Sequence, residues 1–146
     1  MNRLKEEDIL IWIGVVAQLT RTRANRLLAD SKLPFPLFVL LQHFAHDPQR
    51  KWSVTQLTRA FETGQPGMTK KVQKLLALEL LNQSADDKDA RIKWFSINAA
   101  GLHMLESLGE VLRDDIREAF SVWSDVETSQ AHELLSRLKS HLDENR

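Results

Sequence analysis

Residues 53–101 read SVTQLTRAFETGQPGMTKKVQKLLALELLNQSADDKDARIKWFSINAAG, and this stretch decides the fold. It opens with Ser53-Val54-Thr55-Gln56, which predicts a helix start. A serine N-cap and a glutamine three residues later can satisfy each other's free backbone amides. Leu57, Ala60 and Phe61 then give this helix a narrow apolar face.

A second helix follows the break at Thr63-Gly64. Its apolar residues recur at three- and four-residue spacing, which buries one stripe of a helix; they are Met68, Val72, Leu75 and Leu76. The opposite face is short, basic and rich in amides: Gln65, Thr69, Lys70, Gln73 and Lys74. Such a face can contact phosphates and purine edges in a DNA major groove. An ordinary solvated helix surface is the alternative interpretation of the lysines.

The rest of the stretch predicts a β-hairpin with a charged tip. Short strands are expected at residues 82–84 and 92–97, joined by Ala85-Asp86-Asp87-Lys88-Asp89-Ala90-Arg91. Aspartates crowded on a hairpin are commonly turn formers, and the remaining ligands of a calcium loop are missing. Helix, tight turn, helix and hairpin together indicate a winged helix-turn-helix.

These residues resemble the MarR family of bacterial transcriptional regulators. Residues 57–81 align without a gap to the recognition-helix pattern of that family. The wing is more specific: Asp86-x-x-Asp89-x-Arg91 is followed by Ser96-Ile97-Asn98-Ala99-Ala100-Gly101, where the family has leucine, threonine and glycine before a long helix. With the flanking helices, the resemblance covers nearly the whole chain.

Some positions depart from the family pattern. Glu62 stands where the turn between the helices usually has glycine, and Glu79 where a glycine usually ends the recognition helix. Gly64 replaces a serine or threonine cap. Lys71 occupies a slot that is usually apolar, and we expect its side chain to extend from the edge of the buried stripe. These departures concern local geometry and operator sequence, not the fold.

The resemblance implies a homodimeric regulator that binds double-stranded DNA, acting as a repressor. It also implies that Asp89 pairs with Arg91 and, with Asp86, supports the wing, while Arg91 reaches a minor groove. The expected DNA-binding residues are Gln65, Pro66, Gly67, Thr69, Lys70, Lys71, Gln73, Lys74, Lys88 and Arg91. The alternative is a winged-helix protein-interaction module without DNA binding.

Charge is distributed unevenly although the chain has no net charge. Residues 1–49, 50–100 and 101–146 carry net charges of +1, +4 and −5. The positive charge thus lies on the proposed DNA-binding unit. The chain has no cysteine, which excludes disulfides and thiolate chemistry and suits a reducing cytoplasm.

The 146 residues fit a single MarR-like, mainly α domain. Residues 33–98 form its DNA-binding unit, and residues 1–32 and 99–146 form long dimerisation helices. Helices are expected at 6–29, 35–45, 98–124 and 128–142, of which 35–45 is apolar nearly all round and central. The terminal helices have apolar stripes larger than one small domain can cover, which predicts a dimer. The predicted interface comprises Ile9, Trp12, Ile13, Val16, Leu134, Leu138 and Leu142. In the alternative, a monomer, the terminal helices cover each other.

Family members commonly bind small aromatic molecules in a crevice between the dimer helices and the DNA-binding unit. The matching residues are Trp12, Val16, Phe38, Leu41, Gln42, Leu105 and Leu108. A fully packed core without a crevice is the alternative.

No enzyme motif is present: the sequence lacks a nucleophile with a base, a metal set and a phosphate-binding glycine loop. No metal or other cofactor is therefore expected. His43 and His46 lie three apart, but His103, His132 and His141 are scattered, so a buried, hydrogen-bonded His43 and a solvated His46 are expected. The apolar patch near the N-terminus is too short and amphipathic for a membrane span or a secretory signal.

Overall fold

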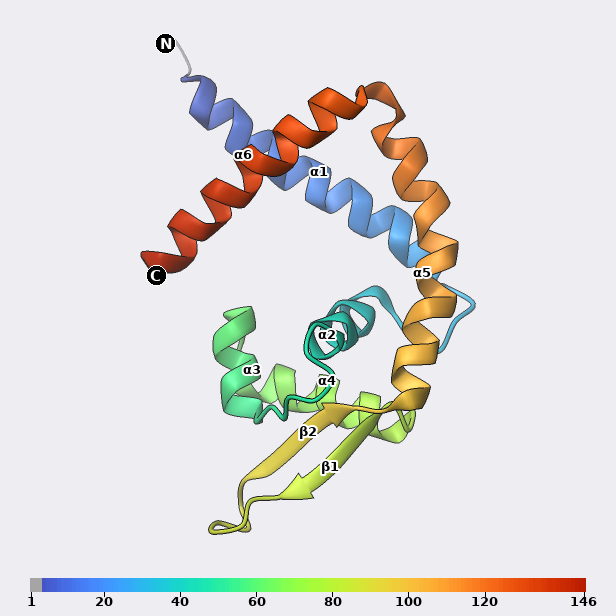
Figure 1. The fold of residues 1–146 in the computed structure, drawn as a ribbon, viewed down its shortest axis with the longest axis vertical. Helices are drawn as coiled ribbons and strands as arrows, with labels where there is room; N and C mark the ends of the chain where they lie inside the picture. The colour runs from blue at the N-terminus through green and yellow to red at the C-terminus, as the bar shows by residue number, and fades with distance from the viewer. Residues whose placement is uncertain (1–3) are drawn as a thin grey trace. The chain divides into compact units, whose positions relative to one another are not determined.

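The computed structural model describes residues 4–146. The chain forms two compact units, one up to Gly109 and the other from Glu110 to Arg146. The first contains α1 (Lys5–Leu27), α2 (Phe35–Ala45), α3 (Val54–Phe61), α4 (Gln65–Ala77), β1 (Leu81–Ala85), β2 (Lys93–Ile97) and the first half of α5 (Ala99–Ala119). The second contains the rest of α5, a 3₁₀ turn at Phe120–Val122 and α6 (Asp125–Glu144). Figure 1 shows the elements. The predicted class, mainly α with one small hairpin, is confirmed.

Helix α2 is central to the first unit, as its composition predicted. Proline at the start is tolerated because a first-turn amide has no helical partner. The helix contacts α1, α4 and β2. It buries Leu37, Phe38, Leu40, Leu41 and Phe44. At roughly 1.5 to 3 kcal/mol for each fully buried large apolar side chain, this helix contributes much of the driving force for folding.

The helix-turn-helix forms as expected. The Ser53 hydroxyl accepts a hydrogen bond from the Gln56 amide at 3.2 Å, and the Gln56 side chain accepts one from the Ser53 amide at 3.3 Å. This reciprocal cap fixes the start of α3, which packs against α4 through Leu57. On α4 the buried stripe is Met68, Val72 and Leu75.

Strands β1 and β2 pair antiparallel, with Leu81 opposite Ile97 and Ser84 opposite Trp94. Since side chains alternate across a strand, Leu81 and Ile97 face the core, while Ser84 and Trp94 lie on the other face. Trp52 adds a single bridge to β2, exchanging two backbone hydrogen bonds of 2.8 Å with Phe95. This bridge ties the loop before α3 to the wing.

Several predicted boundaries were wrong. Helix α1 ends at Leu27 and not at residue 29, β1 covers Leu81–Ala85 and not residues 82–84, and α6 ends at Glu144 and not at residue 142. The helix expected at 98–124 ends at Ala119, and the last helix starts at Asp125, not at residue 128. Ser124 accepts a hydrogen bond from the Glu127 amide at 3.2 Å, and the Glu127 carboxylate accepts one from the Ser124 amide at 2.8 Å. This capping box starts α6, although the apolar period continues through it. The second strand starts at Lys93 because Ile92 belongs to the tip, where its carbonyl accepts from the Asp86 amide.

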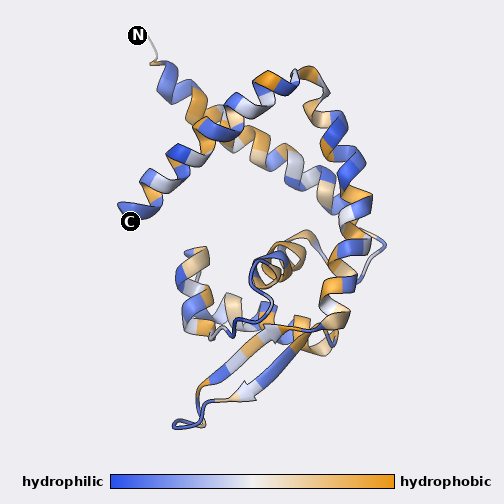
Figure 2. Ribbon diagram, in the orientation of Figure 1, coloured by the Kyte–Doolittle hydropathy of each residue, from blue (hydrophilic) through white to orange (hydrophobic). Residues whose placement is uncertain are grey.

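Apolar residues recur along α1 and α6, where they are drawn orange in Figure 2, and many of them are exposed. On α1 the exposed residues include Ile9, Leu10, Ile11, Trp12, Ile13, Val15, Val16 and Leu19. On α6 they are Val126, Leu134, Leu135, Leu138 and Leu142. Residues 1–3 of the predicted N-terminal dimerisation segment lie outside the described residues. Among the helices that the structure describes, none is long and apolar enough to cross a membrane.

Candidate nucleic-acid interface

The face of α4 opposite its buried stripe is open to solvent. Its side chains surround a shallow hollow lined by Gln65, Pro66, Thr69, Lys70, Gln73 and Lys74. Eight of the ten expected DNA-binding residues lie on α4. Seven of these eight are exposed, and the remaining one, Lys71, is half-buried at the edge of the stripe, as expected. The face is cationic and carries amide groups, which suits contact with a polyanion.

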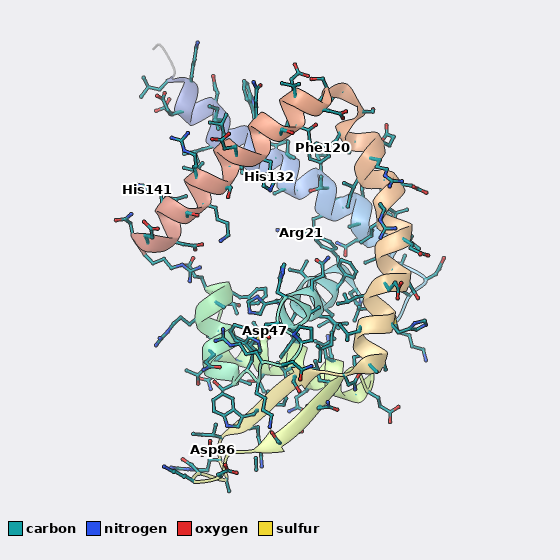
Figure 3. All side chains as sticks on the ribbon, in the orientation of Figure 1. Arg21, Asp47, Asp86, Phe120, His132 and His141 are labelled. Atoms are coloured by element: carbon teal, nitrogen blue, oxygen red, sulfur yellow. The ribbon has the colours of Figure 1, made fainter. Side chains whose placement is uncertain are left out.

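The wing tip is closed by the Asp86 carboxylate, which lies at the end of the hairpin in Figure 3. One oxygen, Oδ2, accepts the backbone amides of Lys88 at 3.1 Å and Asp89 at 3.0 Å. The other, Oδ1, accepts the indole N–H of Trp94 at 2.9 Å. The indole hydrogen bond first, and then the two amides, lower the pKa of the Asp86 carboxyl. The tip is therefore held by an ionised carboxylate.

Asp89, also at the wing tip, binds Arg91. Its carboxylate accepts from the Arg91 backbone amide at 3.0 Å, from Arg91 Nε at 3.1 Å and from Arg91 Nη2 at 3.0 Å. The expected pairing of Asp89 with Arg91 is thus present. It lowers the pKa of the Asp89 carboxyl and raises that of the Arg91 guanidinium. The Arg91 side chain is nevertheless 91% exposed, so it remains accessible to a partner at the tip.

Sequence reasoning missed two residues near the wing. Trp94 donates to Asp86 across eight residues, and Lys51 lines a second hollow, at the hairpin, together with Asp86 and Trp94. Because side chains alternate along a strand, Trp94 lies on the face opposite the buried Phe95 and Ile97. Only the strand register shows that its ring reaches the tip.

The expectation that His43 is hydrogen-bonded was wrong. Its Nε2 atom is buried and has no hydrogen-bond partner in the described part of the chain. The indole Nε1 of Trp52 is likewise buried without a partner there. The His43 ring packs 4.5 Å from the Trp52 ring centroid and 5.0 Å from that of Phe61. Arg50 lies 3.5 Å above the Trp52 ring, a cation–π arrangement. Helix α2, the loop before α3 and the end of α3 bring these aromatic rings together, which local sequence does not reveal.

The residues expected to line a ligand crevice differ in exposure. Phe38 and Leu41 are buried in the core, whereas Trp12, Val16 and Gln42 are exposed. Leu105 and Leu108 on α5 are half-buried. Across residues 4–146, no group of three or more metal-ligating side chains is placed to hold an ion.

No protein-family model matches the chain, and no curated protein matches it in sequence. Solved structures do match. The transcriptional regulator BldR of Sulfolobus solfataricus is 26% identical, covers 97% of this chain and 99% of its own, and has a TM-score of 0.73. A MarR protein of Peptoclostridium difficile is 19% identical over 94% of this chain and 89% of its own, with a TM-score of 0.79. MepR of S. aureus, solved as a DNA complex, is 16% identical over 90% of this chain and 96% of its own, with a TM-score of 0.74.

This chain has the MarR-type winged-helix fold. The similarity extends over both terminal helices as well as the wing. Two glycine positions of the MarR-type pattern hold glutamate here, and these are the positive-φ residues other than glycine in the described chain: Glu62 at 48° and Glu79 at 58°. Both end a helix in the left-handed conformation. At both positions glutamate adopts a conformation that glycine takes at lower cost.

Proposed function

We propose that this chain is a sequence-specific DNA-binding transcriptional regulator of the cytoplasm, acting as a homodimeric repressor rather than an enzyme. The single observation that carries the proposal is the exposed basic and amide face of α4 on the same unit as an exposed arginine at a hydrogen-bonded wing tip. The shared fold with MepR, which was solved bound to DNA, supports it.

The residues divide by chemistry. Lys70 and Lys74 contact phosphates as mobile point charges. Gln65 and Thr69 are placed near the start of α4, the part of a recognition helix that meets base edges. Arg91 enters a minor groove, where narrow A·T-rich DNA enhances the negative potential. Pro66, Gly67, Lys71, Gln73 and Lys88 complete the proposed contact surface.

The exposed apolar surfaces of α1 and α6 support the homodimer. A stable interface needs a well-packed apolar area, and these helices present exposed isoleucine, leucine and tryptophan. We assign residues 1–32 and 99–146 to dimerisation and residues 33–98 to DNA binding. A two-fold dimer presents two copies of α4 to successive major grooves, so half-sites lie about one helical turn apart.

The dimer is tested by Ile9→Asp, with Gln18→Asp as the matched control. Ile9 is 46% exposed on the proposed interface. Nine residues of helix turn through about two and a half turns, so Gln18 lies on the opposite side of α1. Light scattering should give the dimer mass for the wild type and the control and a mass near 16.8 kDa for Ile9→Asp. A wild-type mass of one chain at micromolar concentration would reject the interface.

We further propose that the regulator responds to a small aromatic ligand bound between the dimer helices and the DNA-binding unit. Trp12 and Val16 are exposed, and Phe38 is buried in the core of the first unit. Calorimetry with salicylate and benzoate is the test. Heat of binding together with weakened DNA affinity supports the response. Absence of both supports a packed core.

DNA binding itself is tested with a fluorescent fragment from upstream of the gene and with scrambled DNA, at several salt concentrations. Lys74→Ala should weaken binding to both and flatten the salt slope by about 0.9 per phosphate contact, or about two per dimer. Lys74→Arg keeps the charge and should keep the slope. Gln65→Ala should instead cost roughly 1 to 3 kcal/mol per lost base contact, on the specific fragment alone. If neither Lys74→Ala nor Arg91→Ala changes affinity or slope, the chain is better explained as a protein-interaction module.

A further inference from the structure

The wing tip is tied to its strand by one long-range side-chain contact. Trp94 sits on β2, half-buried on the outer face of the hairpin and opposite Ser84 on β1. Its indole N–H reaches Asp86 Oδ1 at 2.9 Å, eight residues back along the chain. The contact joins the regular part of the hairpin to the irregular tip beyond it.

From Asp86 the contacts continue to the arginine. Asp86 Oδ2 binds the amides of Lys88 and Asp89, and the Asp86 amide donates to the Ile92 carbonyl at 3.0 Å. The backbone of Asp89 is therefore fixed, and its carboxylate holds Arg91 through two nitrogens of the guanidinium. Each link positions the next, in the order Trp94, Asp86, Asp89 and Arg91.

We propose that Trp94 is a positioning residue for Arg91: its hydrogen bond to Asp86 holds the wing tip in the conformation in which Arg91 meets DNA. This inference rests on the proposed function. The physical reason is pre-organisation. The short tip of seven residues, 86–92, can adopt many conformations. Any conformational freedom left in the free protein is lost on binding DNA, which lowers the affinity. The indole supplies that order in advance, and it does so without touching the DNA.

The test is Trp94→Phe, which keeps an aromatic ring and removes the donor. Loss of one hydrogen bond of ordinary strength should weaken binding to the upstream fragment about 3- to 10-fold. The matched control is Ser84→Ala, which changes the neighbouring position on the same outer face and should leave the affinity unchanged.

A double-mutant cycle separates positioning from a general structural effect. If Trp94 acts through Arg91, Trp94→Phe should have little effect in an Arg91→Ala background. Equal effects of Trp94→Phe with and without Arg91 would overturn the inference. If instead Arg91→Ala alone leaves affinity unchanged, the failure lies with the role proposed for Arg91 in DNA binding and not with the Trp94 contact.

A second measurement needs no DNA. Amide hydrogen exchange of Lys88 and Asp89 in the free protein reports how often the tip opens. Trp94→Phe should speed exchange at both amides, while Ser84→Ala should not, and core amides of α4 should be unaffected in both variants. Unchanged exchange at Lys88 and Asp89 in Trp94→Phe would show that the indole does not order the tip, and would overturn the inference whatever the DNA result.

Discussion

Replacing Glu79 by glycine should stabilise the protein. Glu79 has φ of 58° and ends α4 in the left-handed conformation. Its amide donates to the Leu76 carbonyl at 2.9 Å, and the next amide, of Leu80, donates to the Leu75 carbonyl at 3.1 Å. These two hydrogen bonds form a Schellman motif, in which glycine is the usual residue at this position. Asn98 Nδ2 also donates to the Glu79 carbonyl at 2.9 Å, so the geometry is held from outside the helix.

The size of the expected gain in the free energy of unfolding follows from two opposing effects. A side chain in the left-handed region costs about 1 to 2 kcal/mol, which glycine avoids. Glycine also increases the conformational entropy of the unfolded chain, which costs about 0.4 to 1 kcal/mol. The net gain in the free energy of unfolding is about 0.5 to 1 kcal/mol. For a chain of this size that raises Tm by about 1 to 4 °C.

The assay is urea and thermal unfolding at one fixed protein concentration, since dimerisation would make stability depend on concentration. Glu79→Ala is the matched control. It removes the carboxylate but keeps the strained Cβ, so it should lack the gain due to backbone relief. A glycine variant no more stable than the alanine variant would refute the reasoning.

Two further predictions concern stability. Gly101→Ala should lower the free energy of unfolding by about 2 kcal/mol or more, because a Cβ there would lie 2.5 Å from the Leu80 carbonyl oxygen and 2.6 Å from Ile97 Cγ1. Gly109→Ala is the control, because its Cβ would meet nothing within 4 Å, and it should not lower the free energy of unfolding; denaturant unfolding compares the two variants. Burial first, and then the charges of His46 and Arg50, lower the pKa of His43, so the unfolded chain takes up the proton first and the free energy of unfolding should fall as pH drops below about 6.5. His43→Leu should reduce this loss in urea unfolding at pH 7.5 and 5, and an unchanged pH dependence would show that His43 does not cause it.

Sequence alone predicted the parts of the fold that depend on local chemistry. The reciprocal cap of Ser53 and Gln56 and the buried stripe of α4 follow from spacing within one helix. The glutamates at Glu62 and Glu79 were recognised as departures from glycine positions, and both have positive φ. The cap and the stripe need no knowledge of distant packing, whereas the two glycine positions come from the resemblance to the MarR family.

Contacts between elements were not predictable in the same way. The hydrogen bond from Trp94 to Asp86 depends on hairpin register, and the tilted packing of His43 against Trp52 depends on how α2 meets the loop before α3. At Ser124 two local signals competed. The apolar period favoured a continuing helix, but the cap at Ser124 satisfies amides that start a new one.

Hydroxyl-radical footprinting of the upstream fragment tests the central claim most directly, because it reports which minor grooves the protein covers. A dimer that places α4 in successive major grooves and Arg91 in the flanking minor grooves should protect a two-fold symmetric pattern. Arg91→Ala should lose the outer, minor-groove protections while the central pattern remains at saturating protein. Uniform protection without symmetry, or a footprint unchanged by Arg91→Ala, would contradict the assignment of α4 and the wing to DNA.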